Sequence, residues 1–119
     1  MKYVILVPVY NDRESLKLLI ENINYEIKDL NSEISLVVIN DASSQQIVDE
    51  YPNIENIHSI EIINMKENRG HARCIASGLK YILEKEEFDY VIPMDGDGED
   101  RPEEIKFFFG QIFFNNKGF

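Results

Sequence analysis

The sequence predicts an α/β fold, a doubly wound and mostly parallel sheet with helices on both of its faces. Two observations support this: short apolar runs alternate with segments of helical periodicity, and polar loops follow the apolar runs. Strands joined by crossover helices lie parallel, and their ligands bind beyond the carboxyl ends of the strands. Because 119 residues is the size of one domain, we expect residues 1–119 to form a single unit.

The first apolar run covers residues 3–10 and contains no charged side chain. Such a run is typical of a strand buried on both faces. Asn11 or Asp12 is expected to cap the helix that follows. Apolar side chains in this helix recur every three or four residues, which predicts one stripe packed on the sheet. They are Leu16, Leu19, Ile20, Ile23 and Ile27.

A second strand is predicted over residues 34–39, and the polar loop Asn40-Asp41-Ala42-Ser43-Ser44 follows it. The capping residues of this loop predict a short helix over residues 45–51. Residues 57–64 predict a third strand. Together with the first strand, these elements bring two polar loops to one edge of the sheet.

The residues Asn68-Arg69-Gly70 are typical of a turn. A helix with apolar positions from Ala72 to Leu83 is predicted after this turn, and residues 90–94 predict a fourth strand. Pro102 suits the first position of a last helix. That helix would be apolar nearly all round, so we expect another subunit or the rest of a larger domain to bury it. Its apolar residues are Phe107, Phe108, Phe109, Ile112, Phe113 and Phe114.

Acidic residues alternate with glycine directly after the fourth strand, as Asp95-Gly96-Asp97-Gly98-Glu99. Strand alternation directs Asp95 and Asp97 to the same side. Because hard oxygen ligands suit Mg²⁺ or Mn²⁺, we expect Asp95, Asp97 and Glu99 to form a metal site. The alternative is a solvated acidic loop. An EF-hand is excluded, since its sixth position is Asp100 and its twelfth is Lys106.

The net charge of −10 argues against a nucleic-acid partner, because a duplex binder needs a basic face. It also implies that a diphosphate would bind through a divalent cation. The single cysteine, Cys74, excludes an internal disulfide and fits a reducing cytoplasm. We therefore expect a cytoplasmic protein, with peripheral attachment to a membrane left open.

Two further segments have both a structural and a functional interpretation. Asp41 either caps a helix or accepts a hydrogen bond from a base or ribose. Arg69 and Arg73 either balance nearby acids or bind phosphate, since they lie at the start of a helix.

Taken together, these motifs resemble the family-2 glycosyltransferases with the GT-A fold, notably the branch that transfers sugars to dolichol or polyprenyl phosphate. Four segments match in family order and cover essentially the whole chain. They are Val7-Pro8-Val9-Tyr10-Asn11 with Glu14, Val38-Ile39-Asn40-Asp41-Ala42-Ser43, Asn68-Arg69-Gly70 through Arg73 to Gly78-Leu79, and the DxD segment Met94-Asp95-Gly96-Asp97 with Pro102-Glu103-Glu104.

The resemblance implies a Rossmann-like domain that binds a UDP- or GDP-linked sugar and transfers the sugar with the help of Mg²⁺ or Mn²⁺. It places Pro8, Tyr10 and Glu14 around the base and ribose. Asp41 would bind the base, and Arg73 would lie near the nucleotide or its phosphates. Asp95 would contact ribose or metal, and Asp97, with Glu99, would coordinate the cation.

Two departures from the family pattern qualify this interpretation. Asn40-Asp41 stands where the family usually has two acids, so the contacts to the base are expected to differ. Family members also continue past this point with an acceptor-binding half that, in inverting enzymes, carries the general base. The resemblance therefore implies a donor- and metal-binding part, truncated or naturally short, without a catalytic base of its own.

Two alternatives from other classes stay open. One is a non-catalytic nucleotide-binding or assembly module that forms a homo-oligomer through its Phe-rich last helix. The other is a nucleotidyltransferase, which usually has a Gly-rich basic loop where this chain continues from Val7 into Pro8-Val9-Tyr10. The sugar, the base, the acceptor and the stereochemistry are not specified by the sequence.

Overall fold

The computed structural model describes residues 1–44, 47, 51, 54–85, 87–94 and 114–115. In chain order they form β1 (Lys2–Val9), α1 (Arg13–Glu26), β2 (Glu33–Asn40), β3 (Ser59–Asn64), α2 (His71–Lys85), β4 (Tyr90–Pro93) and β5 (Phe114–Asn115). The alternation of strands and helices expected from the periodicity is therefore present.

The strands form one sheet in the order β3-β2-β1-β4-β5. β1 pairs in parallel with β2 on one side and with β4 on the other, and β3 extends the sheet beyond β2 in parallel. The chain builds outward from β1 to β3 and then crosses back through α2 to β4 on the opposite side. The order reverses between β1 and β4, which is where doubly wound sheets bind their ligands.

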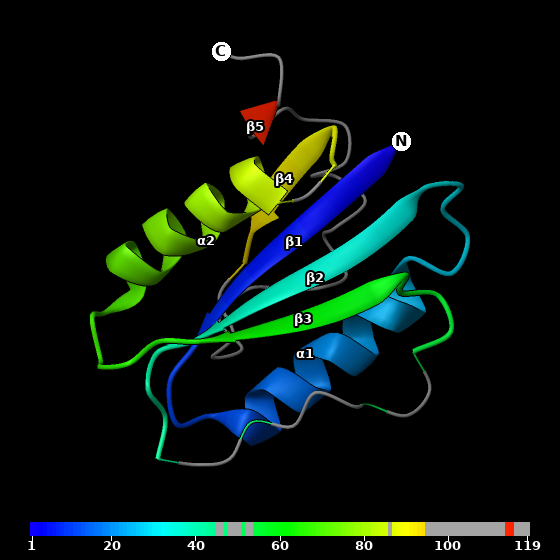
Figure 1. Ribbon diagram of the computed structural model, residues 1–119. Coiled ribbons are helices and arrows are strands. Elements are labelled where there is room, and N and C mark those ends of the chain that lie inside the picture. Colours follow the sequence, from blue (N-terminus) through cyan, green and yellow to red (C-terminus); the bar gives the residue numbers. More distant parts are fainter. Residues whose placement is uncertain (45–46, 48–50, 52–53, 86, 95–113, 116–119) are drawn as a thin grey trace.

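The two helices cover opposite faces of the sheet, as Figure 1 shows. On the α1 face, Leu16, Ile20 and Ile23 pack with Ile5 and Val7 of β1 in one buried cluster. On the α2 face, Cys74 and Ile82 pack in a second cluster; the sheet residues of that cluster are Val4, Leu6, Val37, Ile39 and Val91. Successive residues of β1 thus serve alternate faces, which explains why its sequence is apolar throughout.

Gly78 lets α2 approach the sheet closely. A Cβ atom added at this position would lie 2.4 Å from Leu6 Cδ1 and 3.1 Å from Ile39 Cγ1. Both partners are fully buried, so neither has room to withdraw. The glycine is therefore explained by packing, although glycine lowers helix propensity by about 1 kcal/mol relative to alanine.

Several local predictions are corrected by the structure. Asp12 is the N-cap residue of α1, but its side chain makes no capping hydrogen bond, and Asn11 has a left-handed φ of 49° that breaks the chain direction after β1. β3 begins at Ser59, because the backbone N–H of Ile57 closes a turn onto the carbonyl of Ile54 at 2.9 Å. Of the helix expected over residues 45–51, the described residues Ile47 and Tyr51 are not helical.

The helix expected at the end of the chain is wrong at Phe114. This residue and Asn115 form β5, which pairs antiparallel with β4 through Val91↔Phe114 and Tyr90↔Asn115. The pairing covers the outer edge of β4, and phenylalanine has a high preference for strands. The remaining residues of that expected helix lie outside the described part of the chain.

Candidate functional site

The carboxyl ends of β1, β2 and β3 meet at one edge of the sheet. Val9 is in register with Asn40, and Asn40 with Asn64. Figure 1 shows that the chain also enters both helices at this edge, α1 directly after β1 and α2 after the turn that follows β3. Residues that lie far apart in the sequence therefore gather here, as expected for a doubly wound sheet.

The loop after β1 is held to the loop after β2 by reciprocal hydrogen bonds. The backbone N–H of Asn11 donates to Ser43 Oγ at 2.9 Å. In return, the backbone N–H and the hydroxyl of Ser44 both donate to Asn11 Oδ1, at 2.8 and 3.0 Å. The side chain of Asn11 thus joins two loops.

Asn40 occupies the first of the two positions, Asn40-Asp41, at which the family named above usually has two acids. Its Nδ2 donates to Asn64 Oδ1 at 2.9 Å, while its Oδ1 accepts from the backbone N–H of Ser43 at 3.1 Å. An ionised carboxylate accepts hydrogen bonds but cannot donate one. The amide of Asn40 thus donates to one neighbour and accepts from the other.

Asp41 is buried at the centre of this edge, with 1% of its surface exposed. Its Oδ1 accepts from the backbone N–H of Arg69 at 2.7 Å and its Oδ2 from that of Gly70 at 2.9 Å. Its own N–H donates to the carbonyl of Val9 at 2.8 Å. The carboxylate therefore holds the turn that starts α2, and the direct contact to a base that was expected for it stays a prediction.

Cys74, one turn into α2, is fully buried beside this carboxylate. Burial raises the pKa of the Cys74 thiol to about 12, and a hydrogen bond to Asp41 and the charge of Asp41 add to the effect. The thiol stays protonated at neutral pH, so it is an inert hydrogen-bond donor and no nucleophile.

The other predicted site residues differ in accessibility. Pro8 is buried within β1, whereas Tyr10 keeps 47% of its surface exposed at the end of that strand. Glu14 and Arg73 are exposed in the first turns of α1 and α2. Tyr10, Glu14 and Arg73 are thus open to a ligand.

The two arginines near α2 behave differently. Arg69 forms a side-chain ion pair with Glu67, which agrees with one of its two interpretations, and phosphate binding by Arg69 stays a prediction. Arg73 is exposed and forms no ion pair with any residue that the structure describes. Arg73 is therefore the better candidate for an anionic ligand.

The predicted metal ligands Asp95, Asp97 and Glu99 lie outside the described residues. Within the described ranges, no three His, Cys, Asp or Glu side chains come together in a way that could hold a metal ion. Met94 is the last residue described before them, and its backbone N–H donates to the carbonyl of Leu6 in β1 at 2.8 Å. The acidic segment therefore follows directly from the strand next to β1.

Sequence reasoning missed Asn64, Ser44 and Cys74 as members of this network. A polar residue at the end of each of two neighbouring strands was a usable signal for the Asn40–Asn64 pair. The contacts of Ser44 and Cys74 depend on the folded loops and carried no such signal. In the part of the chain that the structure covers, no helix is long and apolar enough to cross a membrane.

Comparison with known proteins identifies the family. Residues 4–118 match the family model of glycosyl transferase family 2. The chain is also 36% identical, over 107 residues, to the undecaprenyl-phosphate 4-deoxy-4-formamido-L-arabinose transferase of Proteus mirabilis (strain HI4320). That match covers 87% of this chain and 31% of the relative, so the chain spans less than a third of that protein.

Several solved structures share the fold. S. aureus TarS gives a TM-score of 0.63 at 22% identity over 92% of this chain and 20% of its own. A shorter form, TarS 1-349 in complex with UDP-GlcNAc, gives a TM-score of 0.59 at 24% identity. The match covers 92% of this chain and 32% of the TarS chain. The mannosyltransferase PcManGT from Pyrobaculum calidifontis, in complex with GDP-Man and Mn²⁺, gives a TM-score of 0.54 at 21% identity. The match covers 89% of this chain and 32% of PcManGT. With the GT-A fold that these neighbours share and the family match over nearly its whole length, this chain belongs to the family 2 glycosyltransferases.

Proposed function

We propose that this chain binds the nucleotide part of a UDP- or GDP-linked sugar and takes part in metal-assisted transfer of that sugar. The observation that carries the proposal is the convergence of the loops after β1 and β2 with the start of α2 at one edge of the sheet. Relatives with the same fold were solved with UDP-GlcNAc and with GDP-Man, which supports a nucleotide sugar as the ligand class.

We assign the binding roles by accessibility. Tyr10 offers an exposed aromatic ring at the end of β1, suited to contact a base, while the buried Pro8 shapes the strand beside it. Glu14 would accept a hydrogen bond from the ribose. Arg73 supplies a cationic fork toward the nucleotide or its phosphates. Pro8 lies in β1 and Tyr10 follows that strand directly, while Glu14 and Arg73 lie in α1 and α2, the two helices that pack on the sheet.

A divalent cation, Mg²⁺ or Mn²⁺, is proposed as the cofactor. Its support is the acidic sequence Asp95-Gly96-Asp97-Gly98-Glu99 after β4, together with the Mn²⁺ in the PcManGT complex. When bound, such an ion stabilises the negative charge of a departing nucleoside diphosphate. A cation is also what a chain of net charge −10 needs to attract a diphosphate.

Titration calorimetry tests the proposal. UDP-GlcNAc and GDP-mannose are titrated into the chain with Mn²⁺ and again with EDTA. Metal-dependent binding of one donor is expected, and Asp97→Ala should remove that dependence while the circular dichroism spectrum stays unchanged. The matched control is Glu87→Ala, which removes an exposed carboxylate at the other end of the sheet and should leave binding intact. Lack of binding by either donor with metal present would contradict the proposal.

A polyprenyl phosphate is the acceptor class that we propose. The support is the name of the Proteus mirabilis relative, an undecaprenyl-phosphate sugar transferase, which is more than three times as long as the matched part. Incubation of the chain with a radiolabelled donor and undecaprenyl phosphate in detergent tests this step. Label in the lipid fraction would support the acceptor, and label released into water alone would contradict it.

A further inference from the structure

The carboxylate of Asp41 is placed to act on the protein and not on a ligand. One per cent of the residue is exposed, and each carboxylate oxygen already accepts a strong hydrogen bond from a backbone N–H, at 2.7 and 2.9 Å. Hydrogen bonds to an ionised acceptor are about twice as strong as neutral ones. Because this carboxylate is buried, a base could reach it only if part of the protein moved aside.

The turn that Asp41 holds has a shape that needs this anchor. Gly70 has a φ of +85°, a conformation that L side chains rarely adopt. Successive backbone N–H groups around such a residue form a concave site for an anion. Here the anion is a side chain of the protein, supplied from a position 28 or 29 residues earlier in the chain.

The same residue ties this turn to the sheet and to α2. The backbone N–H of Asp41 donates to Val9 in β1, so its main chain is fixed by the sheet. On the other side, the backbone N–H of Cys74 donates to the carbonyl of Gly70 at 3.1 Å, which forms the first turn of α2. Arg73 lies within that first turn and is exposed.

We propose that Asp41 is a positioning residue that fixes the start of α2, and thereby Arg73, at the nucleotide-binding edge without touching the nucleotide. The inference rests on the proposed donor binding. It replaces the direct base contact expected for Asp41 with an indirect role, and it assigns the contact with the ligand to Arg73.

A double-mutant cycle tests the inference. The affinity for UDP or GDP, whichever the wild type binds, is measured with Mn²⁺ for the wild type, Asp41→Asn, Arg73→Ala and the double variant. Asp41→Asn keeps the shape of the side chain but turns an amide donor against one of the two N–H groups. We expect Asp41→Asn to weaken binding about tenfold in the wild type and less than twofold in the Arg73→Ala background. The reason is that both changes remove the same interaction, the contact of Arg73 with the nucleotide. Independent, multiplying effects would show that Asp41 contacts the nucleotide and would overturn the inference.

Two controls separate this role from a general loss of stability. Asn24→Ala breaks a buried clasp in which Asn24 Oδ1 accepts from the backbone N–H of Asn56 at 2.8 Å, so it destabilises the fold away from the edge and should leave nucleotide affinity unchanged. Gly70→Ala disturbs the same turn without altering Asp41. It should also weaken nucleotide binding much more in the wild type than in the Arg73→Ala background. The test therefore stays valid if Asp41→Asn does not fold. Additive behaviour of Gly70→Ala with Arg73→Ala would contradict the inference.

Hydrogen exchange of the Arg69 and Gly70 amides gives a readout that needs no ligand. Both should be protected in the wild type and exchange faster in Asp41→Asn. If the wild type binds no nucleotide while these amides are protected, the proposed function fails and the turn anchored by Asp41 remains. Unprotected amides in the wild type would overturn the positioning role directly.

Discussion

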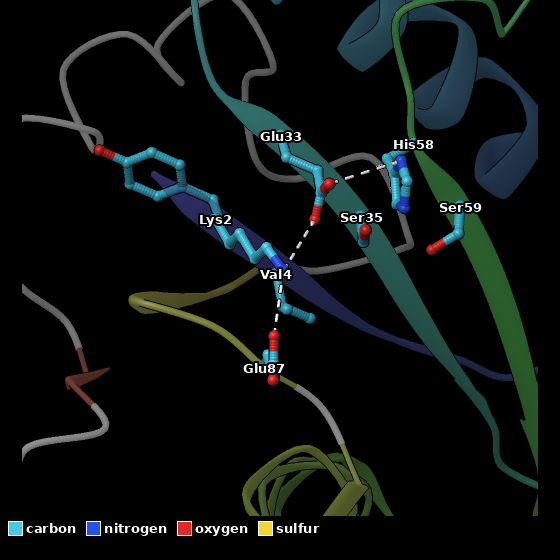
Figure 2. Close-up of a pocket in the computed structure, with 8 residues that line it drawn as sticks. Lys2, Val4, Glu33, Ser35, His58, Ser59 and Glu87 are labelled. Carbon is cyan, nitrogen blue, oxygen red and sulfur yellow. Dashed lines mark hydrogen bonds and ion pairs between the residues drawn. The ribbon is translucent and has the colours of Figure 1, made fainter.

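The two ends of the sheet use charge in different ways. At the carboxyl end, the buried Asp41 is bonded to two backbone N–H groups. At the amino end, a pocket of about 180 Å³ is lined by Lys2, Glu33, His58 and Glu87 among other residues. Figure 2 shows Lys2 between Glu33 and Glu87, with His58 on the far side of Glu33. The ion pairs there span 3.2 to 3.9 Å, and their side chains are 37% to 90% exposed.

Ionic contacts alone therefore do not show which end of the sheet is organised to bind a ligand. Exposed ion pairs are solvated and contribute little to the fold. A buried carboxylate costs free energy unless every oxygen is bonded, and where the bonds are present it determines the conformation of its partners.

The largest expected effect is on the reactivity of the Cys74 thiol. Its pKa, raised from 9.0 to about 12 by burial and by Asp41, reduces the thiolate fraction at pH 8 about a thousandfold. Labelling with a disulfide reagent should therefore be at least that much slower than in the unfolded chain. Ser59→Cys, made in a Cys74→Ser background, places a thiol in the amino-end pocket and should react quickly. Equal labelling rates for the two thiols would contradict the expectation that burial beside Asp41 protects Cys74.

The same raised pKa predicts how stability depends on alkaline pH. A thiol whose pKa is higher in the folded state stabilises that state fully below the unfolded value of 9.0. The contribution is lost as the pH rises from 9 toward 12. Urea unfolding of the wild type and of Cys74→Ala at several alkaline pH values measures it, and the wild type should lose stability more steeply.

The second effect is on stability at the carboxyl end. Asp41→Ala leaves the N–H groups of Arg69 and Gly70 without their acceptor, so we expect the free energy of unfolding to fall by about 3 kcal/mol. Glu33→Ala at the amino end removes an exposed ion pair with Lys2 and a contact with His58, and should cost less than about 1 kcal/mol. Chemical denaturation monitored by circular dichroism measures both. Similar losses in the two variants would remove the distinction between the ends.

The sequence specified the sheet well and the loops poorly, for physical reasons. The continuous apolar run of β1 and the stripe on α1 depend on local pattern, and both were predicted within one or two residues. The gathering of the β1 and β2 loops at one edge followed from parallel topology. The partner of Asp41 could not be predicted, because it lies 28 residues away and its N–H groups are presented by a positive-φ turn. Likewise, Asn11 or Asp12 was expected to cap α1. The role of Asn11 between two loops could not be predicted, because it depends on how close those loops lie in the folded chain.

A smaller effect is expected at Ala42, directly after Asp41. This alanine has a φ of 58°, a left-handed conformation that costs an L side chain about 1 kcal/mol. Ala42→Gly relieves this strain, although it adds freedom to the unfolded chain, so a net gain of about 0.5 kcal/mol is expected. Ser35→Gly in the middle of β2 is the matched control and should be destabilising, because it removes a side chain from a strand. A loss of stability in Ala42→Gly would show that the loop is not strained.

The smallest effect is expected from Lys2, although it has two ionic partners at the amino end. Its ammonium lies 3.2 Å from Glu87 and 3.9 Å from Glu33, and a hydrogen bond to Glu87 raises its pKa. Because these groups are exposed, water and salt replace the attraction almost completely. Lys2→Gln should therefore keep the unfolding midpoint of the wild type in dilute buffer and in 0.5 M NaCl (a roughly twofold shorter screening length than at 0.1 M). A midpoint that falls in dilute buffer and recovers in salt would show that the amino end is held by its charges after all.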